Sequence, residues 1–402
     1  TLWLKKGEDR RIRAGHLWIF SNEIDSAKSP LPDFEPGENA TLRDARGAVL
    51  GSVFVNPHSL ICARLYSRKA DLPLDADLLR QRLQSALGLR QRLYNQPWYR
   101  LCHGEGDLLP GLVMDRFGDH LTVQVGTWGM EARKEELREV LGELLQPRSI
   151  LWDNDIAARS LEGLSRENES EGPVPDVLEV PENGCIFRAP LQGGQKTGWF
   201  YDQRRNRREA ARYAAGADVL DIFCYAGGFG GTAAAAGARS VTFLDASPQA
   251  LALATENAAR NAPELARTKS IEGLCGDARI KGLPVSGKRG TERAVALVAG
   301  ALLDHGQHDQ RRCAVGGLLV VGKTEHAVVG QLVLLFLVGH NDVARDLRIL
   351  PARRKGGSFN DLTNLVLGHR LLGELADASA GFDTFQCFHE NIFLFRVCLT
   401  LL

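Results

Sequence analysis

Short runs of hydrophobic residues alternate with polar turns over the first seventy residues of the chain. Residues 2–4 and 16–20 are compact apolar and aromatic segments, and residues 47–56 alternate like a strand with glycine punctuation. Short strands at regular spacing are typical of small all-β domains. We therefore predict a small β-barrel over residues 1–72.

The pattern then changes to a mixture of helical and strand periods. Leucines at helical spacing between Arg and Gln predict an amphipathic helix over residues 75–95, and residues 131–145 are typical of a charged helix. Strands are expected near residues 112–115 and 121–125. These elements predict an α+β domain over residues 73–185.

Two later segments differ in composition from the rest of the chain. Residues 166–183 are rich in Glu, Pro, Asn and Ser, which predicts a linker. Six of the ten histidines lie beyond residue 278, where Leu and Val runs alternate with Gly, His and Arg. We expect an atypical tail over residues 281–402, with one plausible strand at residues 314–321.

The most informative pattern is a β-α-β unit within residues 186–280. An apolar run ends in the carboxylate of Asp221, turns on Gly227 and Gly228, and enters an Ala-rich helix; a second apolar run ends at Asp245. Glycines let the backbone approach a ligand closely, and an acid at a strand end can bind ribose hydroxyls. The unit is therefore predicted to hold a nucleoside cofactor.

The number of residues between Asp221 and the glycines helps to distinguish which nucleoside cofactor this unit holds. Residues 228–233 fit the dinucleotide fingerprint G-x-G-x-x-G/A, which leaves an NAD-dependent oxidoreductase open. The longer segment between Asp221 and the glycines suits S-adenosylmethionine (SAM) better, because the acid and the turn amides can receive its amino-acid end. Asp245 then suits the ribose diol, and Asp277, after a third expected strand, the adenine amino group. A turn that needs glycine only for packing is the alternative without a ligand.

Two segments combine basic and aromatic residues, which can bind RNA because rings stack on bases and cations pair with phosphates. One is residues 194–208, where three aromatics run into an arginine cluster containing Arg205 and Arg208. The other lies on the expected barrel, and its candidate RNA-binding residues are Lys5, Lys6, Arg10, Arg11, Arg13 and Trp18. A solvated helix start and a solvated barrel rim are the alternatives.

Composition narrows the remaining choices. The formal net charge of the 402 residues is zero, so any nucleic-acid signal must be local. The eight cysteines lack CxxC pairs, which indicates neither a disulfide framework nor a zinc site and fits a reducing cytoplasm. We expect Cys224, inside the cofactor turn, to pack as a small apolar residue. We find no signal-peptide pattern or membrane-spanning run and expect no metal and no membrane partner.

Five segments in order resemble the bacterial ribosomal RNA large-subunit methyltransferase I family, SAM-dependent cytosine-C5 methyltransferases with an N-terminal PUA domain. They are GHLWIFSNEI (15–24), VNPHS (55–59), HGEGDLLPGLVMD (103–115), GQKTG (194–198) with DQR (202–204), and FCYAGGF (223–229). The resemblance covers about the first 278 residues. It implies an α/β fold: a PUA barrel, an α+β connecting domain and a class I methyltransferase (Rossmann-like) sheet. It also implies 23S ribosomal RNA as partner and leaves a homodimer open.

The resemblance further implies which residues contact the cofactor. Those that would bind SAM are Asp221, Tyr225, Gly227, Asp245 and Asp277, and Phe223 and Gly228 belong to the same turn. Those that would shape the pocket beside it are Lys196, Gln203 and Arg204.

Beyond residue 278 the chain departs from the family's pattern. The family shows an Asp-Pro-Pro turn and a strand ending in Ser-Cys-Ser, whose Cys attacks the base, but this chain has neither, and residues 322–325 stand where the Cys is needed. The catalytic residues are therefore left unassigned. We expect residues 281–402 to be unrelated to the family's own tail, through a reading-frame change or a mis-assembled gene. A catalytically inactive RNA-binding protein is the alternative function.

Overall fold

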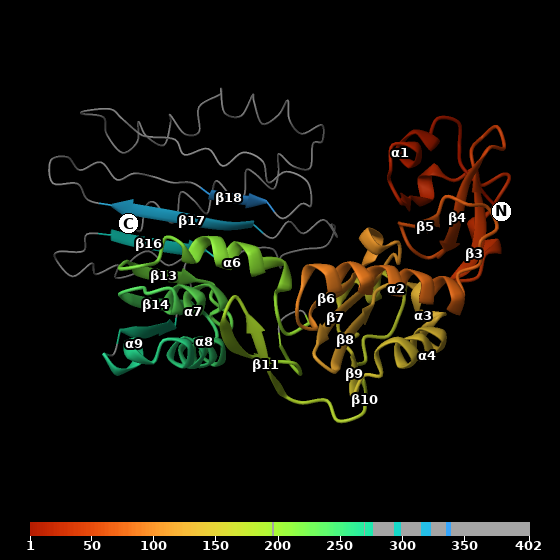
Figure 1. Cartoon of the computed structure of the whole chain (residues 1–402). Coiled ribbons are helices and arrows are strands. Elements are labelled where there is room, and N and C mark those ends of the chain that lie inside the picture. The colour runs from red at the N-terminus through yellow and green to blue at the C-terminus, as the bar shows by residue number, and fades with distance from the viewer. Residues whose placement is uncertain (195–196, 269, 276–292, 299–314, 323–334, 339–402) are drawn as a thin grey trace, which may run out of the picture. The chain divides into compact units, whose positions relative to one another are not determined.

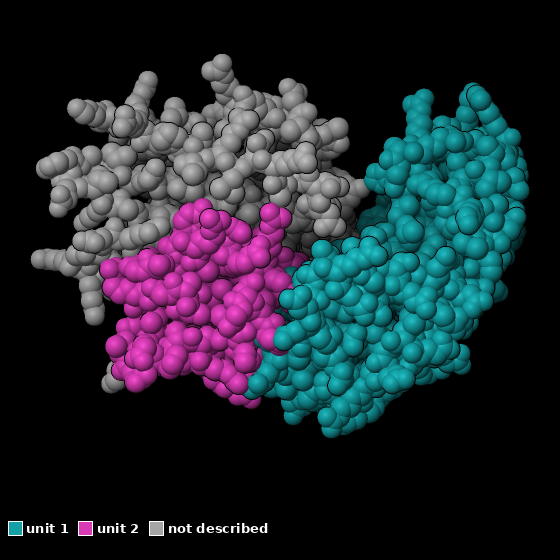
Figure 2. All heavy atoms as spheres, viewed as in Figure 1, with its two compact units in different colours: residues 1–180, 189–201 teal, residues 181–188, 202–402 magenta. Residues whose placement is uncertain are grey.

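The chain divides into two compact units, each with its own sheets and hydrophobic core. The computed structural model describes residues 1–194, 197–268, 270–275, 293–298, 315–322 and 335–338 (Figure 1). Figure 2 distinguishes unit 1, residues 1–180 with 189–201, from unit 2, residues 181–188 with the described part of 202–402.

The first sheet of unit 1 has five short strands in the order β1-β3-β4-β5-β2, with α1 (Asp9–Arg13) between the first two in sequence. The strands are β1 (Leu2–Trp3), β2 (Trp18–Ile19), β3 (Glu38–Arg43), β4 (Val49–Val55) and β5 (Ala63–Ser67). β1 and β3 run parallel, and the other neighbours run antiparallel. Gly51 has a φ of 146°, and a Cβ there would lie 1.9 Å from the Ser67 carbonyl oxygen, which accounts for glycine within β4.

The second sheet of unit 1 has the order β10-β9-β8-β7-β6. Its strands are β6 (Trp98–His103), β7 (Leu112–Phe117), β8 (His120–Val125), β9 (Ser149–Trp152) and β10 (Glu169–Glu171). The helices of this region are α2 (Ala76–Leu93), α3 (Trp128–Glu131), α4 (Lys134–Leu145) and α5 (Ala157–Glu162). The predicted helix over 75–95 and the two predicted strands are confirmed as α2, β7 and β8, while the charged helix begins at Lys134.

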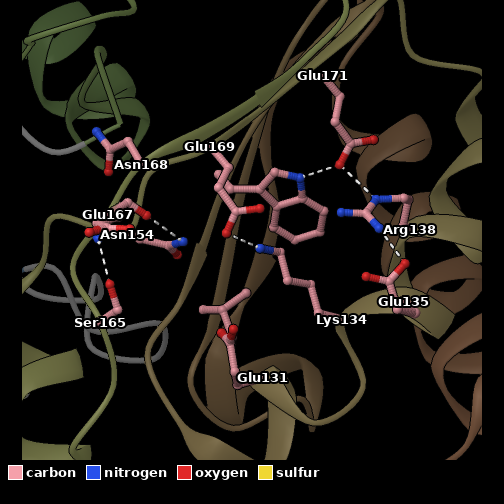
Figure 3. A network of polar contacts seen from close by, with 12 residues as sticks. Glu131, Lys134, Glu135, Arg138, Asn154, Ser165, Glu167, Asn168, Glu169 and Glu171 are labelled. Atoms are coloured by element: carbon pink, nitrogen blue, oxygen red, sulfur yellow. Dashed lines mark hydrogen bonds and ion pairs between the residues drawn. The ribbon is translucent and has the colours of Figure 1, made fainter.

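The predicted linker at residues 166–183 is wrong in part, because it contains β10 and the whole of β11 (Val177–Glu182). Figure 3 shows why a glutamate-rich segment can be a strand here: Lys134 Nζ lies 2.5 Å from Glu169 Oε1, and Arg138 Nε lies 2.7 Å from Glu171 Oε1. The Trp152 ring also donates to Glu171. These partners come from α4 and β9, so the local composition gave no sign of them.

A buried polar network joins the two sheets of unit 1. Arg64, on β5, contacts Glu105 at 3.3 Å and Glu162, at the end of α5, at 3.4 Å; the side chains of Arg64 and Glu162 are each only 3% exposed. The Asn56 side chain donates to Glu162 at 2.8 Å, and Trp18 donates to Glu105 at 2.6 Å. Three of the family-like segments therefore meet at this joint, which fastens the first sheet to the second.

Unit 2 is built on a six-stranded sheet in the order β15-β14-β13-β16-β17-β18. The strands are β13 (Asp218–Ile222), β14 (Ser240–Asp245), β15 (Ile271–Cys275), β16 (Arg293–Val298), β17 (Val315–Gly322) and β18 (Leu335–Val338). β13, β14, β15 and β16 are parallel to one another, whereas β17 is antiparallel to both of its neighbours, β16 and β18. The expected strand at residues 314–321 is confirmed as β17, and β16 and β18 of the tail join the same sheet without having been predicted.

The remaining elements of this region are two strands that pair as a separate sheet and four helices. They are β11, β12 (Cys185–Pro190), α6 (Arg204–Ala211), α7 (Gly228–Ala235), α8 (Pro248–Asn261) and α9 (Pro263–Arg267). Small side chains let α7 approach the sheet closely: a Cβ on Gly230 would lie 2.3 Å from the Phe243 ring of β14. This close packing confirms the β-α-β unit and fixes the turn that precedes α7.

Candidate functional site

The turn between β13 and α7 holds three residues in the left-handed region. Phe223, Tyr225 and Gly227 have φ angles of 58°, 48° and 71°. Non-glycine residues seldom adopt such angles, and they cluster at ligand-binding turns. Gly227 must also lack a side chain, because a Cβ there would lie 2.7 Å from Ala254 Cα on α8. The turn is therefore tight and packed directly on the neighbouring helix.

Asp221 lies near the end of β13 with a side chain that is fully buried. Its Oδ2 accepts a hydrogen bond from the Gly230 amide at 2.8 Å, but no described group donates to Oδ1. Burial raises the pKa of this carboxyl to about 7, against the opposing effects of the Gly230 amide and the Arg207 charge. A buried carboxylate oxygen without a donor is costly, so the site favours a ligand that brings a cationic donor.

Asp245 ends the adjacent strand β14 and is half-buried. Its Oδ2 accepts from the Tyr225 amide at 3.0 Å, and its Oδ1 accepts from the Ser247 amide at 3.0 Å. Because β13 and β14 are parallel, both carboxylates lie at the same edge of the sheet. The strand order also reverses at β13, because β14 and β15 follow on one side of it and β16 on the other, and ligands of open α/β sheets bind at such a position.

Helix α6 packs against α7 and carries the predicted pocket residues Gln203, at its N-cap, and Arg204. Gln203 is buried and accepts from the Asn206 side chain at 2.9 Å. Arg204 Nε lies 3.2 Å from Glu182 Oε2, and Arg207 contacts the other oxygen of the same carboxylate. Arg207 was not predicted, although its charge reaches Asp221.

Comparison with known families places two domains on the chain. Residues 2–68 match the model of a PUA-like domain, and residues 161–277 match that of an S-adenosylmethionine-dependent methyltransferase. The second match contains Asp221, the turn and Asp245, and it ends close to residue 278, where the family-like motifs stop.

Curated relatives agree with these matches. Ribosomal RNA large subunit methyltransferase I of Tolumonas auensis is 37% identical over 67% of this chain and 68% of its own length. The chain belongs to the ribosomal RNA large subunit methyltransferase I family. The family member of Aeromonas hydrophila is 34% identical over 67% of this chain and 69% of that protein. The predicted family is thereby confirmed, and the NAD-dependent oxidoreductase alternative is not favoured.

Solved structures agree on the fold of this family member. A candidate SAM-dependent methyltransferase from Streptococcus mutans aligns with a TM-score of 0.59 at 18% identity, covering 75% of this chain and 87% of that one. A candidate methyltransferase in complex with S-adenosylhomocysteine (SAH) aligns with a TM-score of 0.58 at 17% identity, covering 75% and 86%. The predicted fold class is confirmed, and the chain is a SAM-dependent methyltransferase.

The residues at the carboxyl ends of β13 and β14 fit SAM. The free Oδ1 of Asp221 matches the cationic ammonium group at the amino-acid end of SAM, because a buried carboxylate needs such a partner. Asp245 lies on the neighbouring strand and is half-buried. Two other cofactor residues predicted from the sequence, Lys196 and Asp277, lie outside the described residues.

Cys224 lies inside the cofactor turn but does not have the character of a nucleophile. The residue is buried, and burial together with the nearby Asp221 and Asp245 raises the pKa of its thiol. A thiol in that environment stays protonated at neutral pH. Over the described residues, no cluster of three or more His, Cys, Asp and Glu side chains suits a metal, and no helix is long and apolar enough to cross a membrane.

The residues predicted to bind RNA from the first sheet fall into two groups. Lys5, Lys6 and Arg10 are exposed. Arg11 is paired with Glu23 at 2.7 Å, and Arg13 is paired with Asp9 and Asp44. Trp18 donates to Glu105 and lies beneath the Arg64 guanidinium, so it contributes to the buried joint of unit 1.

The aromatic residues of the 194–208 segment differ from expectation. Trp199 and Tyr201 are buried, and the centroid of the Tyr201 ring lies 5.3 Å from that of Phe117. The prediction that these two rings stack on RNA bases is therefore wrong. Arg205 and Arg208, by contrast, are exposed on α6. The segment thus contributes exposed charge from its arginines, while two of its three rings are core residues.

Proposed function

We propose that the chain transfers a methyl group from SAM to C5 of a cytosine in 23S ribosomal RNA, in the cytoplasm. The observation that carries the proposal is the buried Asp221 carboxylate with one unpaired oxygen, at the sheet edge where Asp245 also ends a strand. The names of the curated relatives support ribosomal RNA as the substrate. Cytosine C5 as the target atom rests on the sequence resemblance.

The donor is assigned to unit 2. Asp221 holds the ammonium group of SAM, Asp245 its ribose hydroxyls, and the turn at Phe223, Tyr225, Gly227 and Gly228 lies against it. Gln203, Arg204 and Asp277 complete the proposed contacts from unit 2, and Lys196, which belongs to the residue range of unit 1, stays a candidate from the sequence resemblance. When bound, SAM supplies a methyl group activated on a sulfonium. The protein's part is to fix that group by charge and shape, which lowers the entropic cost of bringing it to the base.

The RNA is assigned to exposed cationic side chains. Lys5, Lys6 and Arg10 on the PUA-like domain, with Arg205 and Arg208 on α6, are exposed and can reach phosphates, and such contacts hold RNA without reading its sequence. The proposal keeps the predicted boundaries near residues 72, 185 and 280 for the domains that carry these surfaces. A homodimer stays a prediction.

Cytosine C5 becomes nucleophilic only after a thiolate has added at C6, so the reaction needs a cysteine of low pKa. Of the described cysteines, Cys62, Cys102, Cys185 and Cys224 are buried with raised thiol pKa values, and these four do not supply that thiolate. Cys275, at the end of β15, is exposed, and the other three cysteines lie outside the described residues. The chain also lacks the Ser-Cys-Ser and Asp-Pro-Pro motifs. The step after donor binding is therefore the one that an assay must examine.

The test is transfer of tritium from methyl-labelled SAM to undermodified 23S ribosomal RNA. We expect label in 5-methylcytidine after nuclease digestion, and its loss in the matched variant Asp221→Asn. Label at another atom or in another base would contradict the C5 assignment. Binding of SAH without any transfer would favour the catalytically inactive RNA-binding alternative.

A further inference from the structure

Two arginines of α6 converge on one buried carboxylate. The Glu182 side chain, at the end of β11, is 0% exposed, and both Arg204 and Arg207 contact it. The Glu182 carboxylate therefore orients both guanidinium groups inside unit 2. Arg207 is the more deeply placed of the two, with 4% of its side chain exposed against 19% for Arg204.

Arg207 extends from α6 across the start of α7. A Cβ on Gly228 would lie 2.6 Å from Arg207 Nε and 3.1 Å from its Cζ, and the guanidinium lies 5.9 Å from the centroid of the Phe229 ring. Two residues further along α7, the Gly230 amide donates to Asp221. The cation is therefore fixed against the helix start that also holds the Asp221 carboxylate.

The charges that face Asp221 can be named from each element around it. Arg207 on α6 lowers the pKa of Asp221 and Asp245 on β14 raises it, while burial raises it further; the Cys224 thiol, in the turn, is uncharged. Arg207 is the cation in this set. Without it, burial and the like charge of Asp245 would act together against ionisation.

We propose that Arg207 is a positioning residue of the donor site, oriented by Glu182 across Gly228 so that its charge favours the carboxylate form of Asp221. This rests on the proposed function, because that form is the one that pairs with the ammonium group of SAM. It also gives Gly228 a role apart from any contact with the cofactor: its missing side chain makes room for the arginine.

The first experiment measures SAH binding by titration calorimetry between pH 5.5 and 9 for the full chain and for Arg207→Met. In Arg207→Met we expect the pH below which SAH binding weakens to be higher than in the parent chain by about one pH unit or more. The reason is that a neighbouring cation lowers the pKa of a carboxyl by about one to three. Arg207→Lys should restore most of the wild-type profile. Arg212→Met, with an arginine that is 73% exposed at the end of the same helix, is the matched control and should change nothing. A wild-type pH profile in Arg207→Met would overturn the proposal.

The second experiment needs no bound ligand and therefore separates this proposal from the proposed function. The carboxyl titration of Asp221 is followed by carbon NMR in the free chain, assigned with Asp221→Asn, and compared in Gly228→Ala. The added methyl must displace Arg207, so the Asp221 midpoint should rise in a variant that keeps every charge. An unmoved midpoint would contradict the proposal even if SAH binds. Failure of the wild-type chain to bind SAH, with the midpoint shifted as expected, would contradict the proposed function alone.

Discussion

At the scale of single residues, the proposed donor site requires an ionised carboxylate at Asp221, where burial disfavours ionisation. The ordinary pKa of an aspartate side chain is 3.8, and burial raises the pKa of Asp221 to about 7. Between pH 3.8 and about pH 7, Asp221 keeps its proton in the folded chain but has released it in the unfolded chain. The contribution of Asp221 to stability therefore falls as the pH rises from 3.8 to about 7, and above pH 7 the cost is on the order of 4 kcal/mol.

Asp221→Asn removes this ionisation and keeps an oxygen that can accept from the Gly230 amide. We expect the melting temperature of the variant, relative to the parent chain, to rise between pH 5 and pH 7 and to level off above that. Differential scanning calorimetry at several pH values measures the trend. A difference that is constant with pH would show that Asp221 does not titrate in this range.

The arginine cluster shows how far residue roles could be predicted from the sequence. Residues 204–208 were visible as a basic run interrupted by Asn206, but helical spacing alone does not single out Arg207, because Arg207 and Arg208 are the i+3 and i+4 neighbours of Arg204. The sequence therefore contained no signal that identified Arg207. Its partner Glu182 could not have been predicted, because it belongs to a different strand outside the motif.

At the scale of elements, the β-α-β unit was predictable because its signals are local. The apolar runs, the glycine turn and the Ala-rich helix lie within one stretch of chain, and the structure has them as β13, α7 and β14. The strand β10 was missed because its glutamates are neutralised by α4, some thirty residues earlier. Elements that depend on partners remote in sequence are not determined by their own composition.

Because α7 packs closely on β14, we expect substitution by alanine to change stability in opposite directions at two helical glycines. Gly230→Ala adds a methyl 2.3 Å from the Phe243 ring, so overpacking of about 1–3 kcal/mol should lower stability. Gly142→Ala, in α4 with nothing within 4 Å of the new Cβ, should raise stability by about 0.5–1 kcal/mol. Urea unfolding of both variants measures the contrast, and a stabilised Gly230→Ala would refute the packing described here.

At the scale of the whole molecule, the joint in unit 1 predicts that its two sheets unfold together. Glu162→Gln removes the buried one of the two carboxylates that Arg64 contacts. It also replaces a carboxylate, which only accepts hydrogen bonds, with an amide that both donates and accepts. We expect a loss of about 3 kcal/mol. Glu143→Gln, which breaks an exposed pair with Arg80, should cost less than about 1 kcal/mol. Denaturant midpoints measure both, and equal effects would mean that the joint contributes no more than a surface pair.

The tail, residues 281–402, is the part of the molecule whose structure is least predictable from the sequence and from the family comparison. The methyltransferase match ends at residue 277, and the described strands β16, β17 and β18 lie beyond it. A strand such as β17 could be predicted from its apolar run, but its place beside β16 depends on the sheet as a whole. We expect resequencing of the gene across codons 270–290 to reveal a frame change; an uninterrupted frame in an independent isolate would contradict that origin of the tail.

The central claim is that the carboxyl ends of β13 and β14 hold the methyl donor through Asp221. Calorimetric titration of the full chain with SAH and, separately, with NAD at pH 8 tests it most directly. The account predicts binding of SAH alone, weakened at least tenfold in Asp221→Asn because a charge-assisted hydrogen bond contributes about 1.5–3 kcal/mol. Binding of NAD in place of SAH, or equal SAH affinity in the variant, would contradict it.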